Sequence, residues 1–397
     1  THLAFVAAVF TLANGHLLRT STTIMSETPF LLFTTLTLVF FTRVDTSSDL
    51  KNILRNRYTY LFLALFAYAF YLRSAGIALW GGIGLFLLLR KNWRLLFVAA
   101  SGYAVCLAPW ILRGDKMGGS NYVNELFMVN PYRPELGTID PLDYLSRLTT
   151  NAERYILSEI PNGCFSFLNL QMNFVETAKA FRYLFALAFF ALVVFGVYKI
   201  RRQRSLIVGY LLGTTAVLLS WPPAWHGARF ILPIVPLLLF SFFNGLNEVL
   251  AWGNQKKEIY RPLLYLPFVL FTVPGIEFQR AFAVLDYPPS WAHYFETARW
   301  VAQNTDKNAL ISCRKPALFR MYAKRHTTSY LFTPDDKEFM ADLQRRQIDY
   351  LVLDALEYSS TKLYQYPAID KNRDRFEAIF KLEDPPTSLF KFLPTAP

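Results

Sequence analysis

Long apolar runs alternate with short basic clusters along the first 284 residues of the chain. Apolar runs of this kind are typical of membrane-spanning helices, and Lys and Arg gather in the loops that remain on the cytoplasmic side. The pattern therefore predicts a polytopic α-helical membrane protein. The predicted spans cover about 2–18, 30–42, 58–89 in two halves, 95–112, 181–198, 205–220, 230–250 and 262–276.

The run at 58–89 determines which loops share a side of the membrane. A single helix over these residues would be about 48 Å long, well beyond a hydrocarbon core of about 30 Å. The run is interrupted at Arg73-Ser74-Ala75-Gly76, so we expect two short helices that meet in a turn at Arg73. All basic loops then face the cytoplasm, and the isolated charged residues gather at the opposite end. Those residues are Arg19, Glu27, Arg73, Arg113, His226 and Arg229.

A polar segment at about 113–180 separates two of the predicted spans and is too long for a simple turn. Within it, Pro141–Leu148 and Ala152–Ile160 carry apolar residues at three- and four-residue spacing. This spacing predicts amphipathic helices, which can lie in the membrane interface. Two interpretations stay open: a lid or groove for a lipid-borne substrate, or a structural loop packed on the bundle.

Beyond residue 284 the pattern changes, because short apolar segments alternate with amphipathic ones. Strands that alternate with helices predict a small soluble α/β domain. No glycine-rich loop follows any predicted strand, so a nucleotide site is not indicated. The predicted helices are 291–303, 316–323 and 334–346, and the predicted strands are 309–313, 327–331, 348–354, 376–382 and 388–392.

Composition agrees with a membrane protein that has a sizeable water-facing part. Of the 397 residues, 53% are apolar and only 18% are charged, against about 25% in an ordinary soluble domain. The net charge of +12 is spread over short clusters beside apolar runs, with no single basic stripe, which argues against nucleic-acid binding. The three cysteines have no metal-ligand spacing, and their odd number implies no disulfide framework.

Two polar stretches at the non-cytoplasmic end carry the candidate chemistry, since ionisable groups at membrane depth are costly and often functional. In the first, Arg19 and Glu27 flank a row of hydroxyls; the alternative is a solvated loop in which Ser26 or Thr28 caps the next helix. In the second, Arg229 follows Trp225 and His226. A guanidinium suits phosphate, and His226 is a candidate acid or base, metal ligand or plain interface residue.

Four short motifs follow one another along the chain: Met25-Ser26-Glu27-Thr28-Pro29-Phe30, Tyr71-Leu72-Arg73-Ser74-Ala75-Gly76, Ala108-Pro109-Trp110-Ile111-Leu112-Arg113 and Arg229-Phe230-Ile231-Leu232-Pro233-Ile234-Val235-Pro236. In this order they resemble the GT-C membrane glycosyltransferases, in particular bacterial aminoarabinose transferases and protein O-mannosyltransferases. The resemblance covers most of the chain. It implies a GT-C-like helical bundle at 1–284 and a periplasmic α/β domain at 285–397.

The resemblance further implies a multi-pass glycosyltransferase of the bacterial inner (cytoplasmic) membrane, with its C-terminal domain outside the cytoplasm. Such enzymes transfer a sugar, with inversion, from a polyprenyl-phosphate donor to a lipid, glycan or protein acceptor at the outer face. Their main catalytic carboxylate lies in the first outer loop, which we expect upstream of Thr1. The alternative is a transporter or a polymerase-type membrane protein of polysaccharide assembly.

Residue roles follow from the resemblance in the same way. Glu27 would orient the acceptor or bind a metal in support of the missing base, with His226 as a second catalytic candidate. Arg73 and Arg229 would stabilise the leaving phosphate, and Arg19 and Trp225 would contact the substrate. Some relatives use a divalent cation, but no ligand spacing for one occurs in this sequence.

Overall fold

The computed structural model describes residues 2–23, 25–44, 46, 49–116, 122–170, 178–253 and 266–394. The chain divides into two compact units. The first comprises Thr1–Leu126 and Asp140–Val284, and the second comprises Phe127–Ile139 and Leu285–Pro397. The break after Val284 coincides with the boundary between the two predicted domains, whereas 127–139 lies in the second unit and not, as the predicted boundaries have it, in the first.

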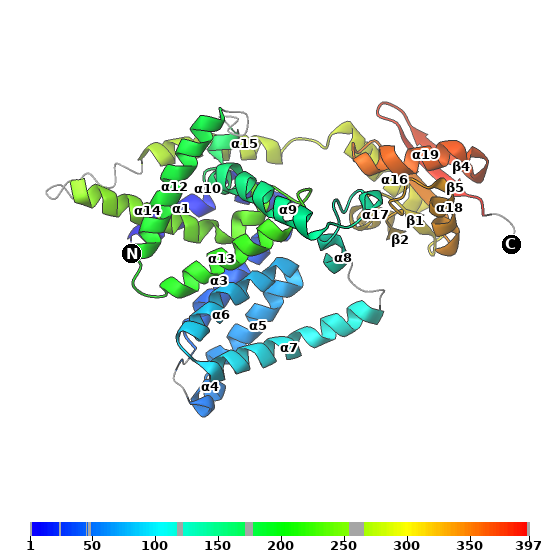
Figure 1. Cartoon of the computed structure of the whole chain (residues 1–397). Helices are drawn as coiled ribbons and strands as arrows, with labels where there is room; N and C mark the ends of the chain where they lie inside the picture. Colours follow the sequence, from blue (N-terminus) through cyan, green and yellow to red (C-terminus); the bar gives the residue numbers. More distant parts are fainter. Residues whose placement is uncertain are drawn as a thin grey trace. The chain divides into compact units, whose positions relative to one another are not determined.

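The first unit is helical (Figure 1). Three described helices are long and apolar enough to cross a membrane: Trp93–Gly114 of α7 (Trp93–Lys116), α12 (Lys179–Lys199), and Ala228–Ala251, which joins η5 (Ala228–Ile234) to α14 (Val235–Gly253). The unit also contains α1 (His2–Leu12), α2 (Gly15–Thr22), α3 (Glu27–Phe41), α4 (Leu50–Arg55), α5 (Arg57–Leu72), η1 (Ser74–Ala78), α6 (Leu79–Leu89), α8 (Tyr122–Leu126), α9 (Pro141–Arg154), η3 (Tyr155–Glu159), α10 (Ile160–Cys164), α11 (Phe167–Leu170), α13 (Arg204–Ser220) and α15 (Leu266–Ala283).

The long helices carry apolar side chains on their outer surfaces. Phe97 and Val105 of α7 are 72% and 73% exposed, and Leu187 of α12 is 69% exposed. Soluble proteins rarely leave large contiguous apolar surfaces in water, so this exterior is consistent with a membrane protein. Three other apolar helical stretches, Glu27–Phe41, Ser74–Leu89 and Arg204–Ser220, are shorter than the usual span.

The predicted interruption at Arg73 is present. Helix α5 ends at Leu72, Arg73 adopts an extended conformation, and η1 leads into α6. The chain reverses direction at this point. The reversal brings the rings of Phe66 in α5 and Trp80 in α6 together, with centroids 5.0 Å apart. Only glycine fits at residue 76, where a Cβ would lie 2.8 Å from the Phe70 backbone nitrogen. The two halves therefore form a helical hairpin, with Arg73 at its tip.

The first predicted span, 2–18, is wrong as a single helix. It breaks after Leu12 and resumes as α2, bent by 52° from α1. Asn14 causes the break, because its side-chain oxygen accepts hydrogen bonds from the His16 and Leu17 backbone amides and caps α2. Its side-chain amide donates to the carbonyl of Gly163 at 2.7 Å, which ties the bend to α10. Since α2 runs to Thr22, Arg19 lies in a helix and not in the expected loop.

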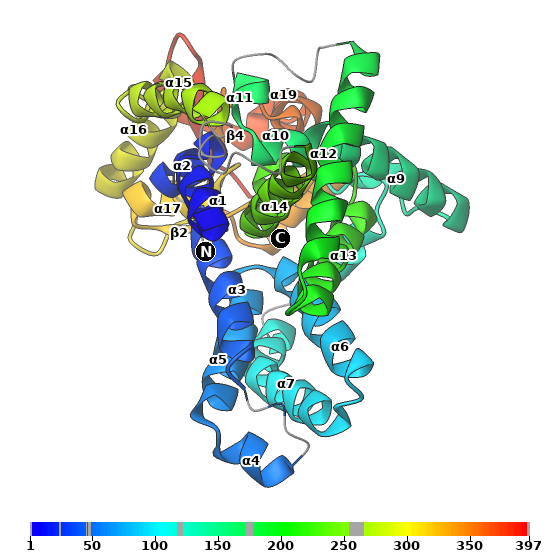
Figure 2. The same cartoon turned by 90° about the vertical axis from the view of Figure 1, so that its left-hand side faces the viewer.

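Helices α12 and α14 approach each other closely through small residues. A Cβ on Gly196 of α12 would lie 1.8 Å from the Ser241 carbonyl of α14, and one on Gly245 of α14 would lie 2.0 Å from the Leu192 carbonyl. Small residues allow helices in membranes to pack backbone against backbone. Figure 2 shows α12 beside α14, and also α3 beside α5.

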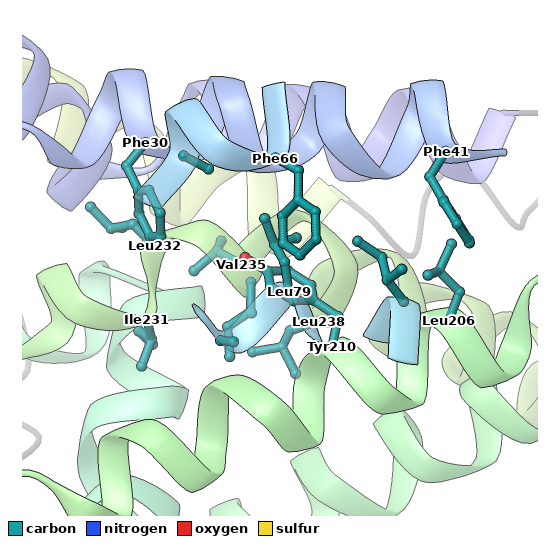
Figure 3. Close-up of a cluster of buried hydrophobic side chains, with 14 of the residues drawn as sticks. Phe30, Phe41, Phe66, Leu79, Leu206, Tyr210, Ile231, Leu232, Val235 and Leu238 are labelled. Atoms are coloured by element: carbon teal, nitrogen blue, oxygen red, sulfur yellow. The ribbon is translucent and has the colours of Figure 1, made fainter. Parts of the chain in front are cut away.

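Aromatic and aliphatic side chains from α3, α5, α6, α13, η5 and α14 form the core of the first unit (Figure 3). Phe30 points toward Leu232 at one end, and Phe41 lies at the other end. The ring of Phe41 is 5.2 Å from that of Phe62 and 5.4 Å from that of Phe86. Because these three residues lie far from the tip of the hairpin, the loops after α3 and α6 share one end of the bundle, and Arg73 lies at the other.

Within the predicted polar segment at 113–180, α9 packs on the bundle. The Asn151 side chain donates to the carbonyls of Leu219 and Trp221 at 2.9 and 2.8 Å, and Arg154 donates to the Pro223 carbonyl at 2.8 Å. These bonds hold α9 against the end of α13. The contacts favour the interpretation of a structural loop, while a role as lid stays a prediction.

The second unit is built around a five-stranded sheet with the order β2-β1-β3-β5-β4 (Figure 1). β1 is parallel to both β2 and β3, and β5 is antiparallel to β3 and β4. The predicted alternation of strands and helices is present, with boundaries that differ by a few residues. The elements are α16 (Pro289–Asn304), β1 (Leu310–Ser312), α17 (Pro316–Ala323), β2 (His326–Thr328), α18 (Asp336–Arg345), β3 (Tyr350–Leu353), α19 (Tyr366–Lys371), β4 (Phe376–Leu382) and β5 (Thr387–Phe392).

The segment 127–139 is anchored to this unit by side chains. The Tyr364 hydroxyl donates to a Glu135 carboxylate oxygen at 2.7 Å and to the Tyr132 carbonyl at 3.2 Å. Arg133 forms an ion pair with Glu135 at 2.9 Å. The two hydrogen bonds of Tyr364 join residues more than 220 positions apart in the sequence.

Candidate functional site

Three of the predicted site residues meet at the end of the first unit where the tip of the hairpin lies. Glu27 is the first residue of α3 and is 3% exposed. Arg73 lies 2.5 Å from its carboxylate, and the Arg229 guanidinium lies 4.0 Å from the same oxygen. Residues from three distant parts of the chain therefore form one cluster of a carboxylate and two guanidiniums.

Local structure explains why each group points to this place. Glu27 lies in the first turn of α3, where the positive end of the helix dipole favours a carboxylate. Arg73 lies between α5 and η1 at the tip of the hairpin. Arg229 is the second residue of η5, which begins directly after Gly227. The φ of Gly227 is 131°, which few residues other than glycine can adopt.

The neighbours of Glu27 and one aromatic ring also position the two arginines. Arg73 donates to the Ser26 hydroxyl at 3.5 Å, and Arg229 approaches the Met25 sulfur at 3.7 Å. The guanidiniums lie 5.3 and 4.6 Å from the centre of the Phe230 ring. Ser26 stands at the N-cap position of α3 but makes no side-chain capping hydrogen bond, and Thr28 lies inside the helix, so neither residue caps α3 as the alternative interpretation has it.

The cluster carries one positive charge in excess, since one carboxylate faces two guanidiniums. Arg73 is largely enclosed, with 18% of its side chain exposed, whereas 46% of the Arg229 side chain is exposed. Arg229 is therefore the group that an anion from outside can reach. A guanidinium matches the geometry of phosphate and of carboxylate.

His226 belongs to a different pair, which the sequence did not suggest. Its Nδ1 lies 3.5 Å from a carboxylate oxygen of Glu159, at the end of the π-helical turn η3. Burial raises the pKa of the Glu159 carboxyl above its usual range, and the nearby His226 and Arg154 oppose that shift. A buried carboxyl beside a histidine is an arrangement that can transfer protons. Single π-helical turns inside helices are often found at functional sites.

The other two predicted residues are Arg19 and Trp225. Arg19 lies over the Phe282 ring of α15, 4.6 Å from its centre. It makes no hydrogen bond or ion pair with Glu27, Arg73 or Arg229 in the described part of the chain. Trp225 packs edge-on against Trp221, with ring centroids 6.2 Å apart.

An apolar recess adjoins the cluster between Phe30, Phe230 and Tyr210. Its volume of about 10 Å³ is too small for a sugar and at the limit for one water molecule. A ligand at this site would therefore bind on the exposed side of Arg229 unless the helices move apart. No group of three or more His, Cys, Asp or Glu residues is placed to hold a metal ion within the described ranges.

Comparisons of the sequence with known proteins identify no relative. No protein-family model matches the chain, and no curated protein is significantly similar to it.

Proposed function

We propose that the protein transfers a sugar from a polyprenyl-phosphate donor to an acceptor at the non-cytoplasmic face of a membrane. The observation that carries the proposal is the cluster of Glu27, Arg73 and Arg229 at one end of an apolar helical bundle. The order of motifs that resembles GT-C glycosyltransferases agrees with it. In this proposal the end that carries the cluster faces away from the cytoplasm, and the apolar surface of the bundle meets the lipid tail.

The chemistry follows from the charge that develops on the leaving group. In an inverting displacement, the bond between the sugar carbon and a phosphate oxygen breaks while the acceptor hydroxyl forms the new bond and loses its proton. Negative charge grows on the phosphate oxygens, and positioned guanidiniums stabilise it. We assign this role to Arg229, with Arg73 behind it.

Glu27 acts in this proposal as a positioning residue. Its carboxylate is held by Arg73 at 2.5 Å and is almost fully buried, so it is poorly placed to take the acceptor's proton. It fixes the two guanidiniums in place instead. Glu159 and His226 are assigned to proton transfer, because they combine a buried carboxyl with an exposed imidazole.

Binding of polyprenyl phosphate tests the proposal without knowledge of the sugar. The purified protein in nanodiscs should bind polyprenyl phosphate, as measured by native mass spectrometry, and Arg229→Ala should weaken binding at least tenfold. Arg280→Ala is the matched control, since Arg280 of α15 is 79% exposed and lies outside the cluster. Equal binding by the wild type and Arg229→Ala would show that the assignment of Arg229 is wrong.

Sidedness gives a second, independent test. Single cysteines at positions 19, 73 and 229 should all react with a membrane-impermeant reagent from the non-cytoplasmic side of intact cells. Reaction of these positions from different sides would contradict the proposed centre.

The broken helix α1–α2 favours a second candidate, a transporter. Discontinuous helices often form the binding sites of transporters, and the 52° bend at Asn14 is such a break. Reconstituted vesicles distinguish the two functions: a transporter would move a polyprenyl-linked substrate across the bilayer, whereas the enzyme would release polyprenyl phosphate after transfer.

A further inference from the structure

A pocket of about 480 Å³ opens on the second unit beside β2, the edge strand of the sheet. Two lysines, two arginines and one histidine line it, and the lining includes no Asp or Glu. Lys307 precedes β1, Arg320 and Lys324 lie at the C-terminal end of α17, and Arg325 and His326 lead into β2. Three separate parts of the fold thus direct positive charge toward one concave surface.

Arg325 is the unusual member of this group, because it is only 8% exposed. Its guanidinium donates to the carbonyls of Ala302 and Thr305 at 2.8 Å each. No carboxylate lies within ion-pair distance of it in the described residues. Buried arginines are ordinarily paired with an acid. Here carbonyl dipoles satisfy the hydrogen bonds, and no acid that the structure describes neutralises the charge of the guanidinium.

The remaining cations also lack partners. Lys307, Arg320 and Lys324 are exposed, and none forms an ion pair within the ranges that the structure describes. Arg320 and Lys324 are four residues apart on one helix, where like charges repel. Lys324 also adopts a left-handed conformation with φ of 52°, which is uncommon outside glycine and asparagine. The left-handed Lys324 ends α17, whereas the pair of like charges has no such local explanation.

Structural roles account for only part of this arrangement. The negative end of the α17 dipole stabilises nearby cations, which offsets some of the repulsion between Arg320 and Lys324. Charged side chains on an edge strand also discourage pairing with other sheets. Arg325 itself also has a structural role, because it donates to carbonyls at the C-terminal ends of α16 and α17. None of these roles requires a concave surface.

We propose that this pocket binds a phosphate ester. A phosphate monoester carries about 1.5 to 2 negative charges at pH 7, which suits a site with four cations, and guanidiniums bind its oxygens in pairs. A volume of about 480 Å³ falls in the range of small-molecule sites and exceeds the needs of a lone phosphate. Ala317 and Met321 provide an apolar wall for the organic part. The proposal does not depend on the proposed sugar transfer.

The test uses the full chain in nanodiscs of neutral phosphatidylcholine, titrated with glycerol 3-phosphate and followed by thermophoresis. We expect saturable binding that weakens with added salt, and at least a tenfold loss of affinity in Arg320→Glu/Lys324→Glu. The control is Lys337→Glu/Lys362→Glu, which makes the same change of charge at two exposed lysines of the same unit outside the pocket. It should bind within twofold of the wild type.

Two further titrations identify the source of the phosphate. Tighter binding of dihexanoyl phosphatidic acid than of glycerol 3-phosphate would support the site and assign it to a lipid headgroup. Equal or weaker binding of the lipid would support the site and assign it to a soluble phosphate ester. Failure of the wild type to bind either ligand, or equal losses in the pocket variant and the control, would overturn the proposal.

Discussion

Glu27 in the first unit and Asp354 in the second are both buried carboxylates, with 3% and 6% of their surfaces exposed. Glu27 has a guanidinium at 2.5 Å and a second one at 4.0 Å. Asp354 follows β3 and accepts one hydrogen bond, from the Leu356 amide, while its second oxygen has no hydrogen-bond partner among the described residues. Burial raises the pKa of the Asp354 carboxyl to about 6, although the Leu356 amide, Arg314 and Lys315 oppose the shift.

The comparison shows that burial alone does not tell what a carboxylate contributes. A charge removed from water is costly, and a close opposite charge repays that cost only when the geometry is good. Glu27 is compensated, so its removal leaves Arg73 uncompensated. Asp354 is not, so its ionised form opposes folding. The same change from acid to amide should therefore have opposite signs at the two positions.

The largest effect is expected for Glu27→Gln. The amide keeps the shape of the side chain but leaves the Arg73 guanidinium, 18% exposed, without its counter-charge. Breaking a buried ion pair in this way costs about 3 kcal/mol or more. Unfolding of the solubilised protein in mixed micelles, followed by circular dichroism, measures the loss.

Glu248→Gln is the matched control for this substitution. Glu248 pairs with Lys199 at 3.2 Å, but its side chain is 35% exposed. An exposed pair contributes about 0.2 to 1 kcal/mol, so the control should unfold nearly as the wild type does. Equal losses in the two variants would mean that Glu27 is not a compensated buried charge.

Asp354→Asn should stabilise the second unit by about 3 kcal/mol at pH 8, since one pKa unit corresponds to about 1.4 kcal/mol. The folded pKa of about 6 lies above an unfolded value of about 3.9. The folded state therefore binds the proton more tightly, and stability falls as pH rises from about 4 to 6. The amide removes that fall, so its advantage should vanish below pH 4.

Hydrogen exchange of the amides in β1 and β3, measured across this pH range, reads the stability of the second unit. Asp374→Asn serves as control, because Asp374 is exposed in the short turn before β4. A variant Asp354→Asn that is less stable than the wild type at pH 8 would contradict the assignment of Asp354 as an uncompensated charge.

How far the sequence predicts these sites depends on how local their causes are. The turn at Arg73 follows from the length of an apolar run against the thickness of a bilayer, which needs no knowledge of neighbours. The meeting of Glu27, Arg73 and Arg229 follows from their shared end of the bundle, although the ion-pair distances do not. In the second unit, alternating strands and helices are visible because each is amphipathic over its own length.

The features that escaped prediction depend on distant partners or on one capping side chain. Glu159 pairs with His226, 67 positions later, and nothing in the residues near either one indicates the other. The place of 127–139 in the second unit rests on the bonds between Tyr364 and Glu135. The break at Asn14 had a signal, since Asn14-Gly15 is a dipeptide that commonly marks turns, but the apolar residues on both sides concealed it.

A double substitution sharpens the comparison with a smaller effect. Glu27→Leu/Arg73→Met removes both charges and leaves apolar side chains of similar length. Replacing a buried ion pair by apolar residues is often neutral, so we expect a loss of about 1 kcal/mol, well below that of Glu27→Gln alone. The same mixed-micelle unfolding measures both variants. A loss of stability equal to the sum of the losses in Glu27→Leu alone and Arg73→Met alone would show that the two residues do not act as a pair.

The smallest effect is expected at Glu159. Its charge is compensated less than that of Glu27 and more than that of Asp354, because a partly exposed histidine faces it. The raised pKa of the folded carboxyl means that stability falls as pH rises above the unfolded value of about 4.3. His226 opposes the raised pKa, so His226→Ala should move this fall to higher pH and change stability by about 0.5 kcal/mol at most. Glu159→Gln should abolish the fall. Unfolding measured from pH 4 to 8 distinguishes the variants, and an unchanged profile in His226→Ala would show that the imidazole does not act on Glu159.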